Sequence, residues 1–128
     1  MNMATLLLLV EDDDNVRPTL EDALREGGFE LELASNGSEA IALLETNKDK
    51  LRGLITDINL DSGPDGWEVA RRGRELIPNL PVVYMSGAAG HEWTSKGVPN
   101  STFLAKPFAP AQLVTAISTL LNTSATPT

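Results

Sequence analysis

Residues 53–66 read Gly-Leu-Ile-Thr-Asp-Ile-Asn-Leu-Asp-Ser-Gly-Pro-Asp-Gly, in which a short apolar run leads to the carboxylate of Asp57. The residues after it are mostly Asn, Asp, Ser, Gly and Pro, which are typical of loops. This pattern predicts a buried strand that ends in an acid. Because ligands of parallel α/β sheets bind beyond the carboxyl ends of the strands, Asp57 is placed for chemistry. The simpler alternative is that Asp57 starts a loop and hydrogen-bonds to its own backbone. The residues at the other strand ends must therefore distinguish between the two interpretations.

Composition limits the classes of function. The chain has 128 residues and 41% hydrophobic content, which suits one domain with a single core. A formal net charge of -8 opposes contact with nucleic acid or an anionic membrane, and we expect neither. There is no cysteine and only one histidine, His91, which excludes disulfides, thiol catalysis and a zinc site. Residues 6–10 are too short an apolar run for a signal peptide or membrane span, so we expect a cytoplasmic protein.

Apolar runs and helical periodicity alternate along the chain. Apolar residues predict five strands, over residues 5–10, 29–34, 53–57, 81–85 and 102–105. Helical spacing predicts helices over 15–26, from a cap at Asn36 through 44, from a cap at Asp65 through 76, over 91–96 and over 109–121. We assign residues 1–122 to one domain and residues 123–128 to a polar C-terminal tail.

Five strand–helix alternations with short connections predict an α/β fold, with an open, parallel, doubly wound sheet between two layers of helices. The strand order is not readable from these patterns. If the order is flavodoxin-like, the switch point lies between strands 5–10 and 53–57, and Glu11, Asp12 and Asp57 converge there.

Polar residues stand at the ends of four predicted strands, namely Glu11 and Asp12, Asp57, Ser86 and Lys106. Three carboxylates that lie together raise one another's pKa unless a cation lies among them, and oxygen ligands with room for water suit Mg²⁺. With the metal bound, Asp57 stays ionised and can attack phosphorus to form an aspartyl phosphate. Ser86 and Lys106 would then bind the phosphoryl oxygens. These residues therefore predict a phosphoryl-accepting pocket.

Each of these residues also has a plainer interpretation. Residues 11–14 can form the solvated start of a helix, where acids favour the helix dipole, and we assign Asp13 and Asp14 that role. Lys106 can be a surface lysine and Ser86 a turn residue. Each plainer interpretation is reasonable for one residue, but all of them would have to be correct at once. We therefore favour the interpretation as a phosphoryl-accepting pocket. We assign no chemistry to His91.

The chain from Leu6 to Leu121 closely resembles the receiver domain of two-component response regulators. The matching motifs are Leu-Val-Glu11-Asp12-Asp, Leu-Ile-Thr-Asp57, Asp65-Gly66, Val-Val-Tyr-Met-Ser86-Gly and Lys106-Pro107-Phe108. The resemblance implies a flavodoxin-like (βα)5 three-layer sandwich with a five-stranded parallel sheet. It also implies a signalling domain rather than an enzyme, one that catalyses only its own phosphorylation and dephosphorylation. A sensor histidine kinase or histidine phosphotransfer protein would be the donor.

The resemblance also implies roles for single residues. Asp57 takes the phosphoryl group from a phosphohistidine, Glu11 and Asp12 hold Mg²⁺ with it, and the backbone carbonyl of Asn59 adds a ligand. Ser86 and Phe103 change position after phosphorylation, while Lys106 assists the reaction. Two features depart from the family pattern. The loop after Asp57 is one residue longer than usual and has Asp61 where Pro is common, and Phe103 lacks the hydroxyl that residues at its position often carry.

We also considered two other functions. A haloacid-dehalogenase-like phosphohydrolase uses similar residues, but its second acid is replaced here by Asn59, which cannot serve as the general acid. A flavin-binding module would need a phosphate loop where this chain has the acids 11–14. We expect a stand-alone receiver without an output domain, which signals to a downstream protein or forms a homodimer through the face formed by residues 87–121.

Overall fold

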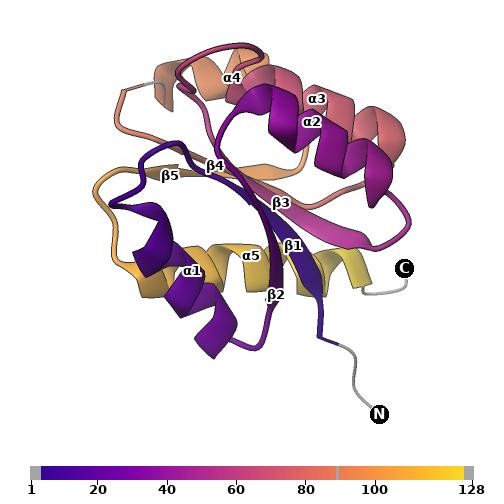
Figure 1. The fold of residues 1–128 in the computed structure, drawn as a ribbon, viewed down its shortest axis with the longest axis vertical. Helices are drawn as coiled ribbons and strands as arrows, with labels where there is room; N and C mark the ends of the chain where they lie inside the picture. Colours follow the sequence, from indigo (N-terminus) through magenta and orange to yellow (C-terminus); the bar gives the residue numbers. More distant parts are fainter. Residues whose placement is uncertain (1–3, 89, 126–128) are drawn as a thin grey trace.

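The structure is a computed structural model that describes residues 4–88 and 90–125 (Figure 1). Strands and helices alternate along it, in the order β1 (Leu6–Val10), α1 (Arg17–Glu26), β2 (Glu30–Ala34), α2 (Gly37–Thr46), β3 (Leu51–Asp57), α3 (Gly66–Leu76), β4 (Val82–Ser86), the 3-10 turn η1 (Gly90–Glu92), α4 (Trp93–Lys96), β5 (Ser101–Ala105) and α5 (Pro110–Ala125). The predicted alternation of strands and helices is confirmed.

The five strands form one parallel sheet in the order β2-β1-β3-β4-β5. This is the flavodoxin-like doubly wound arrangement, and it places β1 beside β3 at the switch point. Val10 pairs with Thr56 in the register of these two strands. The next residues, Glu11 just after β1 and Asp57 at the end of β3, are therefore neighbours at the carboxyl edge of the sheet.

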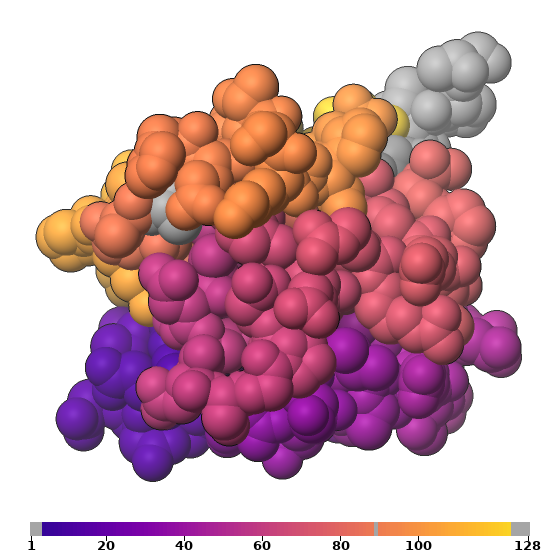
Figure 2. All heavy atoms as spheres, turned by 90° about the horizontal axis from the view of Figure 1, so that it is seen from above, coloured from indigo at the N-terminus to yellow at the C-terminus, as the bar shows by residue number. Residues whose placement is uncertain are grey.

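Helices cover both faces of the sheet, with α1 and α5 on one side and α2, α3 and α4 on the other (Figure 1). Figure 2 shows the second face, where the segment around α4, in orange, lies beside α3. Leu7 and Leu9 join the core under α1 and α5, whereas Leu8 and Val10 join the core under α2 and α3. Because alternate residues of β1 enter opposite cores, the strand is apolar at every position.

The predicted caps of α2 and α3 are confirmed. The Asn36 side chain accepts a hydrogen bond from the Glu39 backbone N–H at 2.8 Å, and Asp65 Oδ1 accepts one from the Glu68 N–H at 3.0 Å. Each cap satisfies a helical N–H that has no partner within the first turn. The cap at Asp65 also fixes where the chain leaves the loop that follows Asp57.

Several boundaries differ from the prediction. Helix α1 begins at Arg17 rather than at residue 15, because residues 13–16 form a turn in which Asp13 accepts the N–H of Asn15 at 2.8 Å. Strand β3 begins at Leu51, since a register shift against β1 accommodates the exposed Arg52. Helix α5 continues to Ala125, so three residues assigned to the tail are helical, while 126–128 lie outside the described residues.

Charge is unevenly distributed along the chain. Glu92, Lys96 and Lys106 are the only Asp, Glu, Lys or Arg residues between positions 76 and 128. Helix α5 and strand β5 contain none, although much of α5 faces solvent. The acids are concentrated in the part of the chain that builds α1, α2 and α3. Across the described residues, no helix combines the length and the apolar character that crossing a membrane needs.

Candidate functional site

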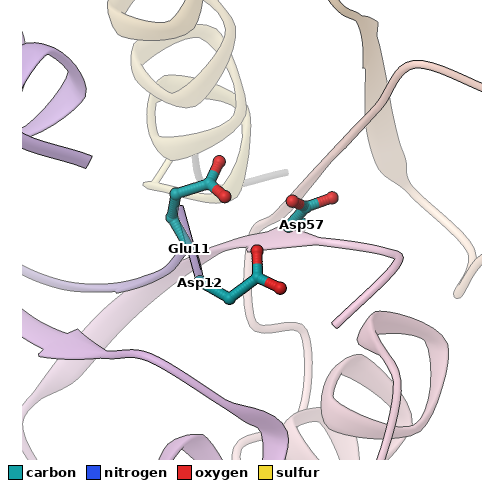
Figure 3. Close-up of side chains that lie close together, drawn as sticks. All are labelled: Glu11, Asp12 and Asp57. Atoms are coloured by element: carbon teal, nitrogen blue, oxygen red, sulfur yellow. The ribbon is translucent and has the colours of Figure 1, made fainter. Parts of the chain in front are cut away.

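Three carboxylates meet at the carboxyl edge of the sheet. Glu11 and Asp12 follow β1, Asp57 ends β3, and one oxygen of each lies within 4.8 Å of the others (Figure 3). Glu11 is fully buried, Asp57 is 7% exposed and Asp12 is half-buried. The adjacency of β1 and β3 thus brings together the acids that the sequence predicted to converge.

Lys106 connects two of these acids. Its Nζ lies 2.8 Å from Glu11 Oε1 and 3.1 Å from Asp57 Oδ2. The residue follows β5, and its backbone N–H donates to the Ser86 carbonyl oxygen at 2.9 Å, which holds it beside the end of β4. The lysine side chain then spans the end of β4 to reach the acids. Lys106 is therefore part of the site, not a free surface lysine.

The site carries more negative than positive charge. Burial raises the pKa of Glu11 to about 7, although the hydrogen bond from Lys106 opposes the rise. Burial alone would lower the pKa of Lys106, but its bonds to Glu11 and Asp57 prevail and the pKa is raised. The cluster thus has three acidic groups and one ammonium, which contacts two of them. Oxygen ligands with an excess of negative charge fit a hard divalent cation such as Mg²⁺, so the residues present fit the predicted metal.

Ser86 ends β4 beside the loop that follows Asp57. Its side chain is buried, and its hydroxyl oxygen accepts the Ala88 N–H at 3.1 Å and an Asn59 side-chain N–H at 3.4 Å. The structure therefore brings Ser86 to the same edge of the sheet as the acids. The Asn59 side chain itself is exposed.

Phe103 lies in β5, three residues before Lys106. Its half-buried ring packs with the α2 and α3 core and stacks on Trp93, with ring centroids 6.3 Å apart. The indole N–H of Trp93 donates to Ser101 Oγ at 2.9 Å, so α4 is held against β5. Phe103 thus contacts the segment between β4 and β5.

Sequence reasoning missed one side chain at the site. Arg17 Nη1 donates to the Glu11 carbonyl oxygen at 2.7 Å, and Arg17 also pairs with Asp14. The sequence does contain a signal for this contact. A basic residue in the first turn of a helix is unfavourable with the helix dipole, which indicates that Arg17 has a partner outside the helix. Asp14, assigned to a solvated helix start, is exposed as predicted and holds Arg17 in place.

A family model described as the response regulator receiver domain matches residues 7–118. The chain belongs to this family. The receiver is 34% identical to the transcriptional regulatory protein CusR of Escherichia coli K12, over 93% of this chain and 52% of CusR. It therefore spans about half the length of this curated relative. It is 33% identical to the response regulator receiver protein CpdR of Brucella abortus, over 90% of this chain and 95% of CpdR.

Solved structures agree with this assignment. A response regulator receiver protein from Sinorhizobium medicae WSM419 shares 45% identity with this receiver at a TM-score of 0.89, over 93% of this chain and 95% of that one. The receiver domain of the hybrid histidine kinase CckA shares 31% identity at a TM-score of 0.77, over 91% of this chain and 98% of the CckA domain. The chain is a receiver domain of two-component response regulators, with an acidic pocket typical of the Mg²⁺ and phospho-Asp site. The phosphohydrolase alternative is not supported.

Proposed function

We propose that this receiver accepts a phosphoryl group from a phosphohistidine on Asp57. The main support is the pair of contacts that Lys106 Nζ makes with Glu11 and Asp57 within the acidic cluster. Asp57 is the only acid in β3 and retains 7% exposure at the sheet edge, whereas Glu11 is fully enclosed. A donor can reach Asp57 more readily than Glu11.

Mg²⁺ is the metal that we propose for this site. The carboxylates of Glu11, Asp12 and Asp57 and the backbone carbonyl of Asn59 would hold it. When bound, the ion supplies positive charge that offsets the charge of the phosphoryl oxygens. The clustering of the three acids within 4.8 Å supports this assignment.

The transfer itself needs a nucleophile and a balance of charge. An Asp57 carboxylate oxygen forms a bond to phosphorus while the P–N bond of the phosphohistidine breaks, and the bonding electron pair stays on the imidazole nitrogen. The Lys106 ammonium, already 3.1 Å from Asp57, would bind a phosphoryl oxygen, and the Ser86 hydroxyl would donate to another. The receiver acts in signalling and catalyses only its own phosphorylation and dephosphorylation.

The donor would be a sensor histidine kinase or a histidine phosphotransfer protein, and the receiver would act in the cytoplasm. After transfer, Ser86 would turn toward the phosphoryl group and Phe103 would move with it. We propose that the output passes to a protein partner or a second copy through the face formed by Gly87 to Leu121. The sparse charge of that face and the contact of Phe103 with Trp93 support this. The net charge of -8 supports a protein partner rather than direct binding to nucleic acid or a membrane.

The acceptor is tested by intact-mass analysis after treatment with acetyl phosphate and Mg²⁺. The wild type should gain one phosphoryl group, Asp57→Asn should gain none, and the matched control Asp13→Asn should be labelled like the wild type. Labelling of Asp57→Asn at the wild-type level would place the acceptor on another residue. Labelling that persists in excess chelator would refute the role of the metal.

The output face is tested by hydrogen exchange with and without beryllofluoride, which mimics the phosphoryl group. Changes in protection should appear within residues 87–121. Phe103→Ala should remain phosphorylatable but lose these changes, whereas Phe29→Ala, outside this face, should retain them. Changes confined to α1 and α2 would refute the output face and leave the acceptor assignment intact.

A further inference from the structure

The loop between β3 and α3 touches the acidic cluster through its backbone. The N–H of Asp61 donates to Asp12 Oδ2 at 3.2 Å. The donor is a backbone N–H, which every residue type except proline provides. Asp61 therefore supplies a donor aimed at one of the three acids.

The three acids are held in different ways. Lys106 Nζ binds Glu11 at 2.8 Å and Asp57 at 3.1 Å. Asp12 is the least buried of the three and instead accepts the N–H of Asp61. A half-buried aspartate can rotate about its side-chain bonds, and ordering it for a ligand costs entropy. The Asp61 N–H reduces that freedom before any ion arrives.

The loop is fixed at two other points, so the N–H of Asp61 has a defined place. At its base, the Gly66 N–H donates to the Ile58 carbonyl oxygen at 2.9 Å. On its outer side, Pro64 lies against Gly37, the first residue of α2, so closely that a Cβ on this glycine would come within 2.0 Å of the Pro64 oxygen. The longer loop is thus packed on the start of α2, which supports its backbone beside Asp12.

We propose that Asp61 is a positioning residue for the metal site, and that it acts through its backbone N–H rather than through its charge. The hydrogen bond holds the Asp12 carboxylate in the cluster with Glu11 and Asp57, and a carboxylate that accepts one N–H keeps further lone pairs for an ion. The exposed Asp61 carboxylate is not part of the cluster. This inference rests on the proposed Mg²⁺ site.

The first test is Mg²⁺ affinity measured by calorimetry. Asp61→Pro removes the donor, and we expect binding about tenfold weaker, as is typical when the partner of a metal ligand is lost. Asp61→Asn keeps the N–H and removes an exposed charge, so it should weaken Mg²⁺ binding less than Asp61→Pro does. Thermal unfolding without metal checks that both variants fold. The proposal is overturned if Asp61→Pro binds like the wild type, or if Asp61→Asn is as weak as Asp61→Pro.

The variant Asp12→Ala separates this inference from the proposed function. If it binds Mg²⁺ as tightly as the wild type, the metal site itself is wrong. If it binds weakly while Asp61→Pro does not, only the role of Asp61 fails.

A second measurement leaves position 61 unchanged, so it remains decisive if Asp61→Pro does not fold. The amide proton of Asp61 is followed by NMR in the wild type and in Asp12→Asn. A carboxylate acceptor deshields an amide proton more than a neutral amide does, so the resonance should move upfield in Asp12→Asn. The amide of Gly28, in the turn between α1 and β2, should not move. An Asp61 resonance that stays in place would overturn the hydrogen bond.

Discussion

The raised pKa of Glu11 predicts that stability depends on pH when metal is absent. Its carboxyl is fully buried and has a pKa of about 7, against 4.5 for the same group in the unfolded chain. Between about pH 4.5 and about pH 7, Glu11 therefore keeps its proton in the folded protein but has released it in the unfolded chain. The stabilisation is complete below about pH 4.5 and is lost as the pH rises through about 7. At about 1.4 kcal/mol per pKa unit, the loss amounts to roughly 3 kcal/mol.

The assay is chemical denaturation in chelator at several pH values, with the unfolding free energy obtained by linear extrapolation. Between about pH 4.5 and about pH 8, the unfolding free energy of the wild type should fall by roughly 3 kcal/mol more than that of Glu11→Gln, which has no titrating group at this position. Glu26→Gln changes an exposed acid and should follow the wild-type curve. Mg²⁺ at the higher pH should restore stability, because the ion compensates the buried charge. Parallel pH curves for the wild type and Glu11→Gln would refute the reasoning.

Three further substitutions test contacts of the fold by the same denaturation assay. Gly66→Ala places a methyl group 2.3 Å from a backbone oxygen of β3, so we expect a loss of about 1–3 kcal/mol and weaker Mg²⁺ binding. Tyr84→Phe removes the hydroxyl that accepts the buried Val98 N–H at 3.0 Å, which should cost about 1–3 kcal/mol. Ile117→Ala leaves a cavity between α5 and the sheet and should cost about 2–5 kcal/mol. A loss below about 0.5 kcal/mol in any variant would contradict the contact that it removes.

Local patterns were sufficient for the elements and for the residues at the strand ends. The caps at Asn36 and Asp65 depend on residues three positions apart, and both are confirmed. The convergence of Glu11 and Asp57 depends on which strands are neighbours, which no local pattern contains. The resemblance to receivers suggested that order, and the pairing of β1 with β3 confirms it.

The remaining features depend on side-chain hydrogen bonds, which the hydrophobic pattern does not indicate. The bond from Arg17 to the Glu11 carbonyl and the bond between the Trp93 indole and Ser101 join separate segments of the fold, and periodicity does not reveal them. The end of α5 was placed too early because its last residues are polar. Polar residues on the outer side of a helix do not end it, and the Thr123 hydroxyl bonds to the Thr119 carbonyl at 2.9 Å.

The absence of charge from α5 has a consequence for the ionic strength at which partners bind. A protein that docks against α5 can form no ion pair with that helix, whose sequence from Pro110 to Ala125 has no charged residue. Added salt screens exposed charges over about 10 Å or less, so it should weaken binding that depends on ion pairs with charged parts of the surface more than binding through contacts on α5. For a second copy of a chain with net charge -8, salt would even favour the approach by screening mutual repulsion. The salt dependence of association thus distinguishes docking on α5 from docking on a charged part of the surface.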